Sequence, residues 1–407
     1  MTVPSPAPSP ASTAARRFQL HEIVGRGGFG TVWRASLHDV GGFSRQVALK
    51  LMHYEGPAAE EVARRMRDEA RLLGRIRHRA VVGVHSLFRH STASTGGWGV
   101  VMEYIDGIDL STAIQRERPS LPVLLEIVEE VAGALYAAHN LTPPGEEAPL
   151  RLVHRDVKPG NVRITRQGEV KLLDFGVANA DVKGREAAIH QGVIMGSSRY
   201  LAPERHRGED THQGDVYALG ILMANTLTGK RFPDPPRVAA EHAAFLGNLL
   251  ETVGHALAEA DAPEVRAAER GVRMLLLEML AFECHDRPDA HSVEQRCRRL
   301  RSGLPTPWLR DWAEATVPRL AAEAARNAQA EAVKAAAQAP AGAEVAARPQ
   351  QSPGDWLEAL GDAPDAPARA RSGQTRPLLI GGVIGLLVGL GLCAAAFAAL
   401  TISALPH

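Results

Sequence analysis

Two short polar motifs, His154–Asn161 with the sequence HRDVKPGN and Asp174-Phe175-Gly176, constrain the fold of this chain more than any other feature. The strand-like runs 162–165 and 169–173 lie between them and flank a turn at 166–168, which is the pattern of a β-hairpin. Because a hairpin brings its two ends together, we expect the two motifs to lie side by side. Exposed loops held by rigid elements are where catalytic residues are commonly found.

The side chains of these motifs suit a metal-bound phosphate beside a hydroxyl group. Asp156 offers a carboxylate that can accept or orient a hydroxyl proton, and Lys158 offers a cation for a phosphoryl oxygen. Asn161 and Asp174 supply a neutral and an acidic oxygen, the ligands that Mg²⁺ prefers. Gly176 lets the chain turn sharply after the acidic ligand. An ordinary charged loop is the competing interpretation, and it does not account for the spacing of the two motifs.

In these motifs and their spacing the chain resembles the eukaryotic-like (Hanks-type) serine/threonine protein kinases found in bacteria. A lysine two residues after the aspartate is the pattern of that family's serine/threonine branch, as against its tyrosine branch. The resemblance implies an α+β, two-lobed fold, in which a small antiparallel β-sheet lobe with one main helix precedes a larger, mostly helical lobe. It extends over about residues 18–302, and it implies that Asp215 braces the catalytic loop and that Arg287 pairs with Glu204.

A glycine-rich segment, Gly25–Gly30 with the sequence GRGGFG, lies between the strand-like runs 18–24 and 31–36. Glycines let backbone N–H groups approach phosphate oxygens closely. Dinucleotide-binding proteins also contain GxGxxG, where it opens a helix, but the β-branched and aromatic residues that follow here favour a kinase hairpin. The resemblance therefore implies ATP as the bound nucleotide. The implied contact residues are Val24, Gly25, Gly27, Gly28, Gly30, Val32, Ala48, Lys50, Met102, Glu103, Ile105 and Arg163.

The resemblance also assigns roles to individual residues. Lys50, on the strand 47–50, would hold the α- and β-phosphates, and Glu69, on the helical pattern 60–77, would pair with it. Met102 would be the gatekeeper at the start of a hinge whose backbone bonds to adenine. The implied catalytic residues are Asp156, Lys158, Lys50 and Glu69. The implied metal ligands, for Mg²⁺ with Mn²⁺ as an alternative, are Asn161 and Asp174.

Two departures from the family pattern concern nucleotide affinity and activation. The family places an apolar side chain beneath the adenine at the position of Arg163, so we expect the stem or the guanidinium plane of this arginine to pack on the base. Arg155 precedes the catalytic aspartate, and relatives with this arginine often dock a phosphorylated threonine on it. The segment 174–195 contains no Ser, Thr or Tyr. We therefore hypothesise that no phosphate in the middle of this segment switches the enzyme, and that Glu186 substitutes as a fixed anion.

The segments around the catalytic region differ from it in composition. Residues 1–17 are rich in Pro, Ser and Ala and are predicted to be a disordered tail. Residues 303–376 are predicted to form an Ala/Pro-rich juxtamembrane helix, within 308–347, followed by a flexible linker. The insertion 141–150 is interpreted either as a partner-specific protrusion or as a plain loop.

A charge-free run near the carboxyl end predicts a membrane anchor. The run from 378 to 405 has 28 residues, more than the roughly 20 that cross a bilayer. We therefore expect a single transmembrane helix over 377–405 and an extracytoplasmic tail of 406–407. Because arginines precede the helix, we expect the kinase domain on the cytoplasmic side of the inner (plasma) membrane. Three residues share one helix face in a small-xxx-small pattern that leaves a homodimer and a monomer as open alternatives: Gly381, Gly385 and Gly389.

The overall composition limits the classes of partner. The 46 basic and 46 acidic residues balance, so the net charge gives no indication of a nucleic-acid partner. The three cysteines have neither a paired nor a metal-ligand spacing and fit a reducing compartment. We therefore predict transfer of the ATP γ-phosphoryl group to Ser or Thr hydroxyls of protein substrates in membrane-tethered signalling. The alternatives are a membrane-anchored pseudokinase that acts as a nucleotide-binding scaffold, and a kinase for a small molecule.

Overall fold

The computed structural model describes residues 17–27, 30–38, 42–52, 64, 67, 70–91, 96–175, 198–338 and 356–358. All of them belong to the first of the two units into which the chain divides, Met1–Ala363 and Pro364–His407. The predicted tail, apart from Arg17, and the predicted transmembrane helix with its three spaced glycines lie outside the described residues.

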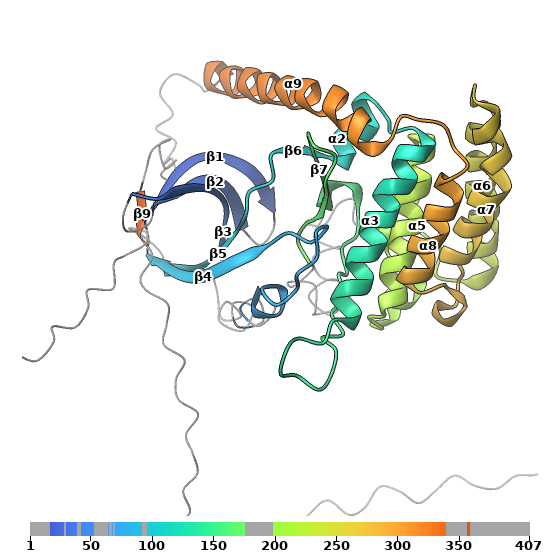
Figure 1. Ribbon diagram of the computed structural model, residues 1–407, viewed down its shortest axis with the longest axis horizontal. Coiled ribbons are helices and arrows are strands. Elements are labelled where there is room, and N and C mark those ends of the chain that lie inside the picture. Colours follow the sequence, from blue (N-terminus) through green and yellow to red (C-terminus); the bar gives the residue numbers. More distant parts are fainter. Residues whose placement is uncertain are drawn as a thin grey trace, which may run out of the picture. The chain divides into compact units, whose positions relative to one another are not determined.

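An antiparallel sheet forms most of the small lobe (Figure 1). Its first five strands are β1 (Arg17–Gly27), β2 (Gly30–His38), β3 (Ser44–Met52), β4 (Val84–Ser91) and β5 (Gly96–Glu103). The spatial order is β4-β5-β3-β2-β1-β9, so β3 is paired on both sides. Phe18, Leu20, Leu49 and Val101 are buried in one apolar cluster of this lobe. Because β3 is a central strand, the position of Lys50 on it is fixed by both neighbours.

The turn between β1 and β2 needs glycine for steric reasons. Gly27 pairs with Gly30 at the end of the ladder. Gly30 has a φ of 155°, and a Cβ added to it would lie 2.3 Å from the carbonyl oxygen of Leu51. No other residue fits there, so the hairpin is pressed closely against β3.

A sixth strand of the sheet comes from the region predicted to be a linker. β9 (Trp356–Glu358) pairs antiparallel with β1, and Phe18 lies opposite Leu357. β1 would otherwise be an edge strand with unpaired N–H and C=O groups, and β9 satisfies some of them. The structure thus differs from the predicted linker, because backbone pairing at a sheet edge depends little on which side chains the added strand carries.

The large lobe is built around two helices, α3 (Leu121–Asn140) and α5 (His212–Thr228). Every residue of α5 from 214 to 226 is buried, as expected for a helix that is covered on all sides. The other elements of this lobe are α2 (Leu110–Arg116), η1 (Pro159–Asn161), η3 (Ser198–Tyr200), η4 (Pro203–Arg207), α6 (Ala239–Ala258), α7 (Pro263–Met279), η5 (Cys284–Asp286) and α8 (Ala290–Arg301). A three-stranded sheet of β6 (Gly107–Asp109), β7 (Val162–Thr165) and β8 (Val170–Leu172) adjoins α2 and α3. The predicted α+β, two-lobed fold is confirmed for the described residues.

The predicted pair of Arg287 and Glu204 is confirmed as a buried, bidentate ion pair. The two N–H···O distances are 2.7 and 2.9 Å, and the side chains are 0% and 1% exposed. Thr211, the N-cap of α5, donates its hydroxyl to Glu204 and accepts the N–H of Gly214. Glu204 therefore links η4, the start of α5 and the loop that carries Arg287.

Helix α9 (Leu309–Gln338) lies within the region predicted to be a juxtamembrane helix, but its first half packs on the large lobe. It contacts α3, β6 and β7. Leu309, Trp312 and Leu320 on this helix are buried in the large-lobe core. The hydroxyl of Thr316 donates to Glu117 at 2.8 Å, next to the end of α2. The described chain therefore has a folded lobe that continues at least to residue 320, beyond the predicted boundary at 302.

The described helices include none that is both long enough and apolar enough to cross a bilayer. Helix α9, the longest of them, carries charged residues throughout the part that packs on the large lobe. The predicted span at 377–405 lies outside this part of the chain.

A buried histidine makes the stability of the large lobe sensitive to acid. His242 on α6 is 2% exposed, and its Nε2 lies 3.0 Å from the hydroxyl of Tyr217. Burial, with the nearby Arg287 charge, lowers the pKa of His242 from 6.5 to about 4. The folded state therefore keeps this ring neutral, whereas the unfolded chain binds a proton below about pH 6.5.

We expect the free energy of unfolding to decrease as the pH falls from 6.5 to 4 because of His242, by on the order of 2 kcal/mol, and to level off below the folded-state pKa. Urea unfolding of the wild type and of His242→Phe at several pH values measures this contribution. Carboxylates also titrate in this range, so the informative quantity is the difference between the two proteins. A difference that is constant between pH 7 and pH 4.5 would show that His242 is not the titrating group.

Candidate active site

The segment 154–161, which is the predicted catalytic loop, is held in place by Asp215 in the first turn of α5. The backbone N–H groups of His154 and Arg155 donate to the two carboxylate oxygens of Asp215, at 2.6 and 2.8 Å. Arg205 donates to the same carboxylate at 2.6 Å, and the side chains of Arg205 and Asp215 are almost fully buried. Arg155 has a φ of 68°, a left-handed backbone that such a brace stabilises. The predicted role of Asp215 is confirmed.

His154 joins the two motifs through both of its ring nitrogens. Nε2 lies 2.9 Å from the carbonyl oxygen of Leu173, and Nδ1 accepts the N–H of Asp156 at 3.2 Å. These partners require a neutral ring with its proton on Nε2, and burial lowers the pKa of His154, despite the nearby Asp215 carboxylate. The ring also packs on Phe175, with centroids 4.5 Å apart. The predicted closeness of the two motifs is confirmed.

Asp156 is surrounded by two side chains from its own loop. Lys158 Nζ donates to Asp156 Oδ2 at 2.7 Å, and Asn161 Nδ2 donates to the same oxygen at 2.9 Å and to the Asp156 carbonyl at 2.8 Å. The backbone carbonyl of Asn161 accepts the N–H of Leu173, directly before Asp174. The loop thus fixes the carboxylate, one cation and one amide in a single hydrogen-bonded group.

Lys50 of the small lobe meets Asp174 of the large lobe. Its Nζ lies 2.5 Å from Asp174 Oδ1. Burial acts to raise the pKa of Asp174, but the charge and hydrogen bond of Lys50 outweigh it, and the pKa lies below its usual value. Asp174 is therefore ionised at neutral pH. Glu69, the predicted partner of Lys50, lies outside the described residues, so that pairing stays a prediction.

The sheet register shows how some of the predicted nucleotide-contact positions are arranged relative to Lys50. Val32 pairs with Lys50, Ala48 with Met102, and Gly25 with Val32. Neighbours in a ladder carry their side chains on the same face, so these positions share one face with Lys50. Gly28 lies outside the described residues, and only the backbone of Gly27 is described.

The donor set suits Mg²⁺, which proteins usually hold through one or two carboxylates together with substrate phosphates. The Nδ2 of Asn161 is used by Asp156, so its amide oxygen would be the atom that holds a metal, and Asp174 would add an ionised carboxylate. Among the described residues there is no group of three or more His, Cys, Asp or Glu side chains that could bind a metal without such phosphates.

The sequence family described as "Protein kinase domain" matches residues 18–297, more than two thirds of the chain. The chain belongs to the protein kinase family. Serine/threonine-protein kinase PknA of Mycobacterium tuberculosis is 34% identical over 228 residues, which cover 55% of this chain and 50% of PknA. Tyrosine-protein kinase MasK of Myxococcus xanthus is 32% identical over 277 residues, 66% of this chain and 40% of MasK. This kinase therefore spans about half, or less, of the length of these relatives.

A solved structure was also matched. The crystal structure of the Mycobacterium tuberculosis PknI kinase domain aligns with 70% of this chain and 95% of the PknI chain, at 24% identity and a TM-score of 0.47.

Two basic side chains of the large lobe bind the segment around the predicted hinge, residues 102–105, of this kinase. The sequence indicated neither contact. Arg163 donates from Nε to the Ile105 carbonyl at 2.9 Å and from Nη2 to the Gly107 carbonyl at 2.8 Å. Lys171 donates to both carboxylate oxygens of Glu103, at 3.0 and 3.1 Å. The guanidinium of Arg163 is thus bound to backbone at the end of the hinge. These bonds lie in its plane, so packing of its plane or its stem on the base stays a prediction.

Arg155 also has a partner that the sequence did not indicate. Its Nε lies 2.9 Å from a carboxylate oxygen of Asp210, in the turn between η4 and α5. Asp210 also lies 3.8 Å from the Nε of Arg205. Glu186, the anion proposed for this arginine, lies outside the described residues. Arg155 is therefore paired with a carboxylate of the large lobe.

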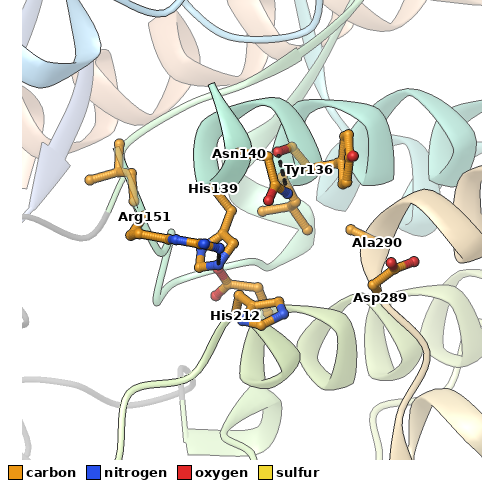
Figure 2. A pocket seen from close by; sticks show the side chains of 10 residues that line it. Tyr136, His139, Asn140, Arg151, His212, Asp289 and Ala290 are labelled. Atoms are coloured by element: carbon orange, nitrogen blue, oxygen red, sulfur yellow. Dashed lines mark hydrogen bonds between the residues drawn. The ribbon is translucent and has the colours of Figure 1, made fainter. Parts of the chain in front are cut away.

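A pocket of about 200 Å³ lies behind the catalytic loop, at the ends of α3 and α5 (Figure 2). His139 of α3 and His212 of α5 stack there with ring centroids 4.1 Å apart, and Arg151 Nη1 lies 3.2 Å from His139 Nε2. Burial lowers the pKa of both histidines. Asp215, which binds the backbone of the catalytic loop, also lines this pocket. The pocket therefore adjoins the residues that hold the loop in place.

Proposed function

We propose that this chain is a serine/threonine protein kinase that transfers the γ-phosphoryl group of ATP to Ser or Thr side chains of proteins. The observation that carries this proposal is the 2.7 Å bond between Lys158 and Asp156. It places the lysine of the serine/threonine branch beside the carboxylate that would meet the acceptor hydroxyl. The similarity to PknA, a serine/threonine-protein kinase, supports the same acceptor class.

In the proposed mechanism, the side chains of the two motifs position and neutralise the reactants. Asp156 orients the acceptor hydroxyl and accepts its proton, and Lys158, bonded to the same carboxylate, faces the transferred phosphoryl oxygens. Lys50, fixed in the centre of the small-lobe sheet, neutralises the phosphates of ATP from the other side. Asn161 and Asp174 would hold Mg²⁺, which supplies further neutralisation of phosphate charge when bound.

The test is incubation of the purified full chain with Mg²⁺, ATP labelled at the γ-phosphate and a mixture of unrelated proteins, followed by phosphoamino-acid analysis. We expect label on serine and threonine. Label on tyrosine alone would overturn the acceptor class. Binding of ATP without any transfer would indicate a scaffold.

We further propose that residues 377–405 anchor this kinase in the inner membrane with the catalytic domain in the cytoplasm, and that Gly381, Gly385 and Gly389 contact a second copy. The support is the charge-free run and the arginines before it. Carbonate extraction of membranes tests the anchor, with release of the wild-type chain as the contrary result. Crosslinking of the wild type and of Gly385→Ile tests the dimer. Equal crosslinking of the two proteins would exclude a dimer contact at these glycines.

The ion pair of Arg155 and Asp210 gives a prediction about the rate of catalysis. Asp210→Asn is expected to lower kcat about tenfold, the effect of losing one charged hydrogen bond, with little change in KM for ATP, because the pair supports the loop that carries Asp156. Glu209→Gln is the matched control, since Glu209 is 55% exposed and pairs with Arg207. Steady-state kinetics measure both. An unchanged kcat for Asp210→Asn would show that this carboxylate does not position the loop.

A further inference from the structure

A groove of about 570 Å³ adjoins the catalytic loop on the large lobe. Its lining comes from α2, η1, η3, the middle of α5 and the loop after α5, and it includes Lys158. Because Lys158 donates to Asp156, one end of the groove lies at the carboxylate that would orient the acceptor hydroxyl. A protein segment whose hydroxyl reaches Asp156 therefore has neighbouring side chains that can enter this groove.

Two arginines from separate segments line the groove. Arg199 lies on η3, and Arg231 lies in the loop after α5. Both act on the phenol of Tyr200: burial raises the pKa of this phenol, and the charges of Arg231 and Arg199 partly oppose that rise. Tyr200 lines the groove as well, so the two cations share its lining with this phenol.

A buried asparagine holds both segments in place. Asn225 of α5 is 6% exposed and donates to the Lys230 carbonyl at 2.5 Å, and its amide oxygen accepts the hydroxyl of Tyr200 at 3.3 Å. Gly229 ends α5 with a φ of 68°, which turns the chain toward Lys230. The backbone directly before Arg231 is thus fixed relative to η3.

Of these two arginines, Arg199 has one acidic side chain at the limit of ion-pair distance, and Arg231 has none among the described residues. Arg199 approaches Asp234 only to 4.0 Å, and both side chains are largely exposed. Arg231 is exposed and forms no ion pair with any residue that the structure describes. Exposed arginines are usually solvated surface groups, but here two of them line one groove together with the apolar side chains of Ile114 and Phe232, which makes a surface able to recognise a side chain.

We infer that this groove selects acceptor segments that carry an acidic side chain near the Ser or Thr, and that Arg231 and Arg199 bind that side chain. This inference rests on the proposed function and names its class of substrate. A carboxylate or a phosphorylated residue supplies the oxygens that a guanidinium binds with two parallel hydrogen bonds. A lysine at the same place would be repelled by both arginines.

The test uses the full chain and two matched serine peptides that differ only in having Glu or Lys at the three positions on each side of the acceptor. We expect kcat/KM to be about tenfold higher for the acidic peptide than for the lysine peptide. This ratio is about what one charged hydrogen bond contributes. Arg231→Glu should reverse the preference, and Arg199→Gln should weaken it. Arg237→Glu is the control, because Arg237 is exposed in the same loop region but does not line the groove.

Equal kcat/KM values for the two peptides, or an unchanged preference in Arg231→Glu, would overturn the inference while leaving the kinase activity in place. If no peptide were phosphorylated, the proposed function would be in question, and fluorescence anisotropy of the labelled peptides would still measure the preference. Tighter binding of the acidic peptide to the wild type than to Arg231→Glu would support the groove, and equal binding would overturn it. Thermal melting of each variant identifies any loss of folding.

Discussion

Asp156→Asn is expected to lower kcat about 10³-fold, because an amide cannot accept the proton of the acceptor hydroxyl. The substitution keeps the size of the side chain, and the bond from Asn161 to the Asp156 carbonyl involves only backbone at position 156. The loop should therefore keep its conformation, and the KM for ATP should change little. Single-turnover and steady-state assays of phosphate transfer measure both quantities.

The control for this prediction is a carboxylate near the hinge but outside the catalytic loop. Asp106 is 69% exposed and lies 3.8 Å from Arg166, so Asp106→Asn should retain wild-type activity. The melting temperature of Asp156→Asn should match that of the wild type. If Asp156→Asn kept more than a third of the wild-type kcat, Asp156 could not be the group that accepts the proton.

Local spacing was enough to predict the centre of the site. His154, Asp156 and Asn161 lie within eight residues, and the hairpin of β7 and β8 returns the chain to Asp174, so few conformations are available. The pair of Arg287 and Glu204 was predicted across a larger separation only through the family resemblance. Nothing in the sequence between them indicates which arginine meets Glu204.

The hinge braces could not be predicted because they depend on register between distant strands. Arg163 reaches the carbonyls of Ile105 and Gly107 because β6 pairs with β7, with Asp109 opposite Arg163. Backbone carbonyls are present at every residue, so they leave no pattern in the sequence. Asp210 was missed for a related reason, since an acidic residue in a turn is usually solvated and its partner lies 55 positions earlier.

The docking of α9 did leave a signal. Its buried residues are spaced at three- and four-residue intervals, which is the stripe of a helix packed on a core. They are Leu309, Trp312, Ala313, Thr316, Val317 and Leu320. The composition around them, rich in Ala, Glu and Arg, suggested a juxtamembrane helix instead. Composition describes the average of a segment, whereas packing depends on one face of it.

Arg287→Met is expected to lower the free energy of unfolding by about 3–5 kcal/mol, the cost of breaking a buried ion pair by removing one partner. All five N–H donors of Arg287 are used: two bind Glu204, and three bind the carbonyls of Ala281, Phe282 and Gln213. Methionine fills much of the space but leaves the Glu204 carboxylate buried without its cation. Urea unfolding at pH 7 measures the loss.

The matched control for Arg287→Met is the same substitution in an arginine–glutamate pair that is more exposed to solvent. Arg296 and Glu278 form a bidentate pair with N–H···O distances of 2.5 and 3.0 Å, but their side chains are 25% and 41% exposed. Water can solvate Glu278 when its partner is removed, so Arg296→Met should cost less than about 1 kcal/mol. Similar losses for the two variants would show that burial is not the cause of the effect.

The pH dependence separates loss of charge pairing from loss of packing. In the wild type, burial acts to raise the pKa of Glu204, but Arg287 outweighs it and the pKa is lowered from 4.5. This contribution to stability is present above pH 4.5 and is lost as the pH falls through the folded-state pKa. Without Arg287, burial raises the pKa of Glu204, and the carboxyl can take up a proton. The stability difference between wild type and Arg287→Met should therefore narrow from pH 7 to pH 5, whereas a packing defect would leave it constant.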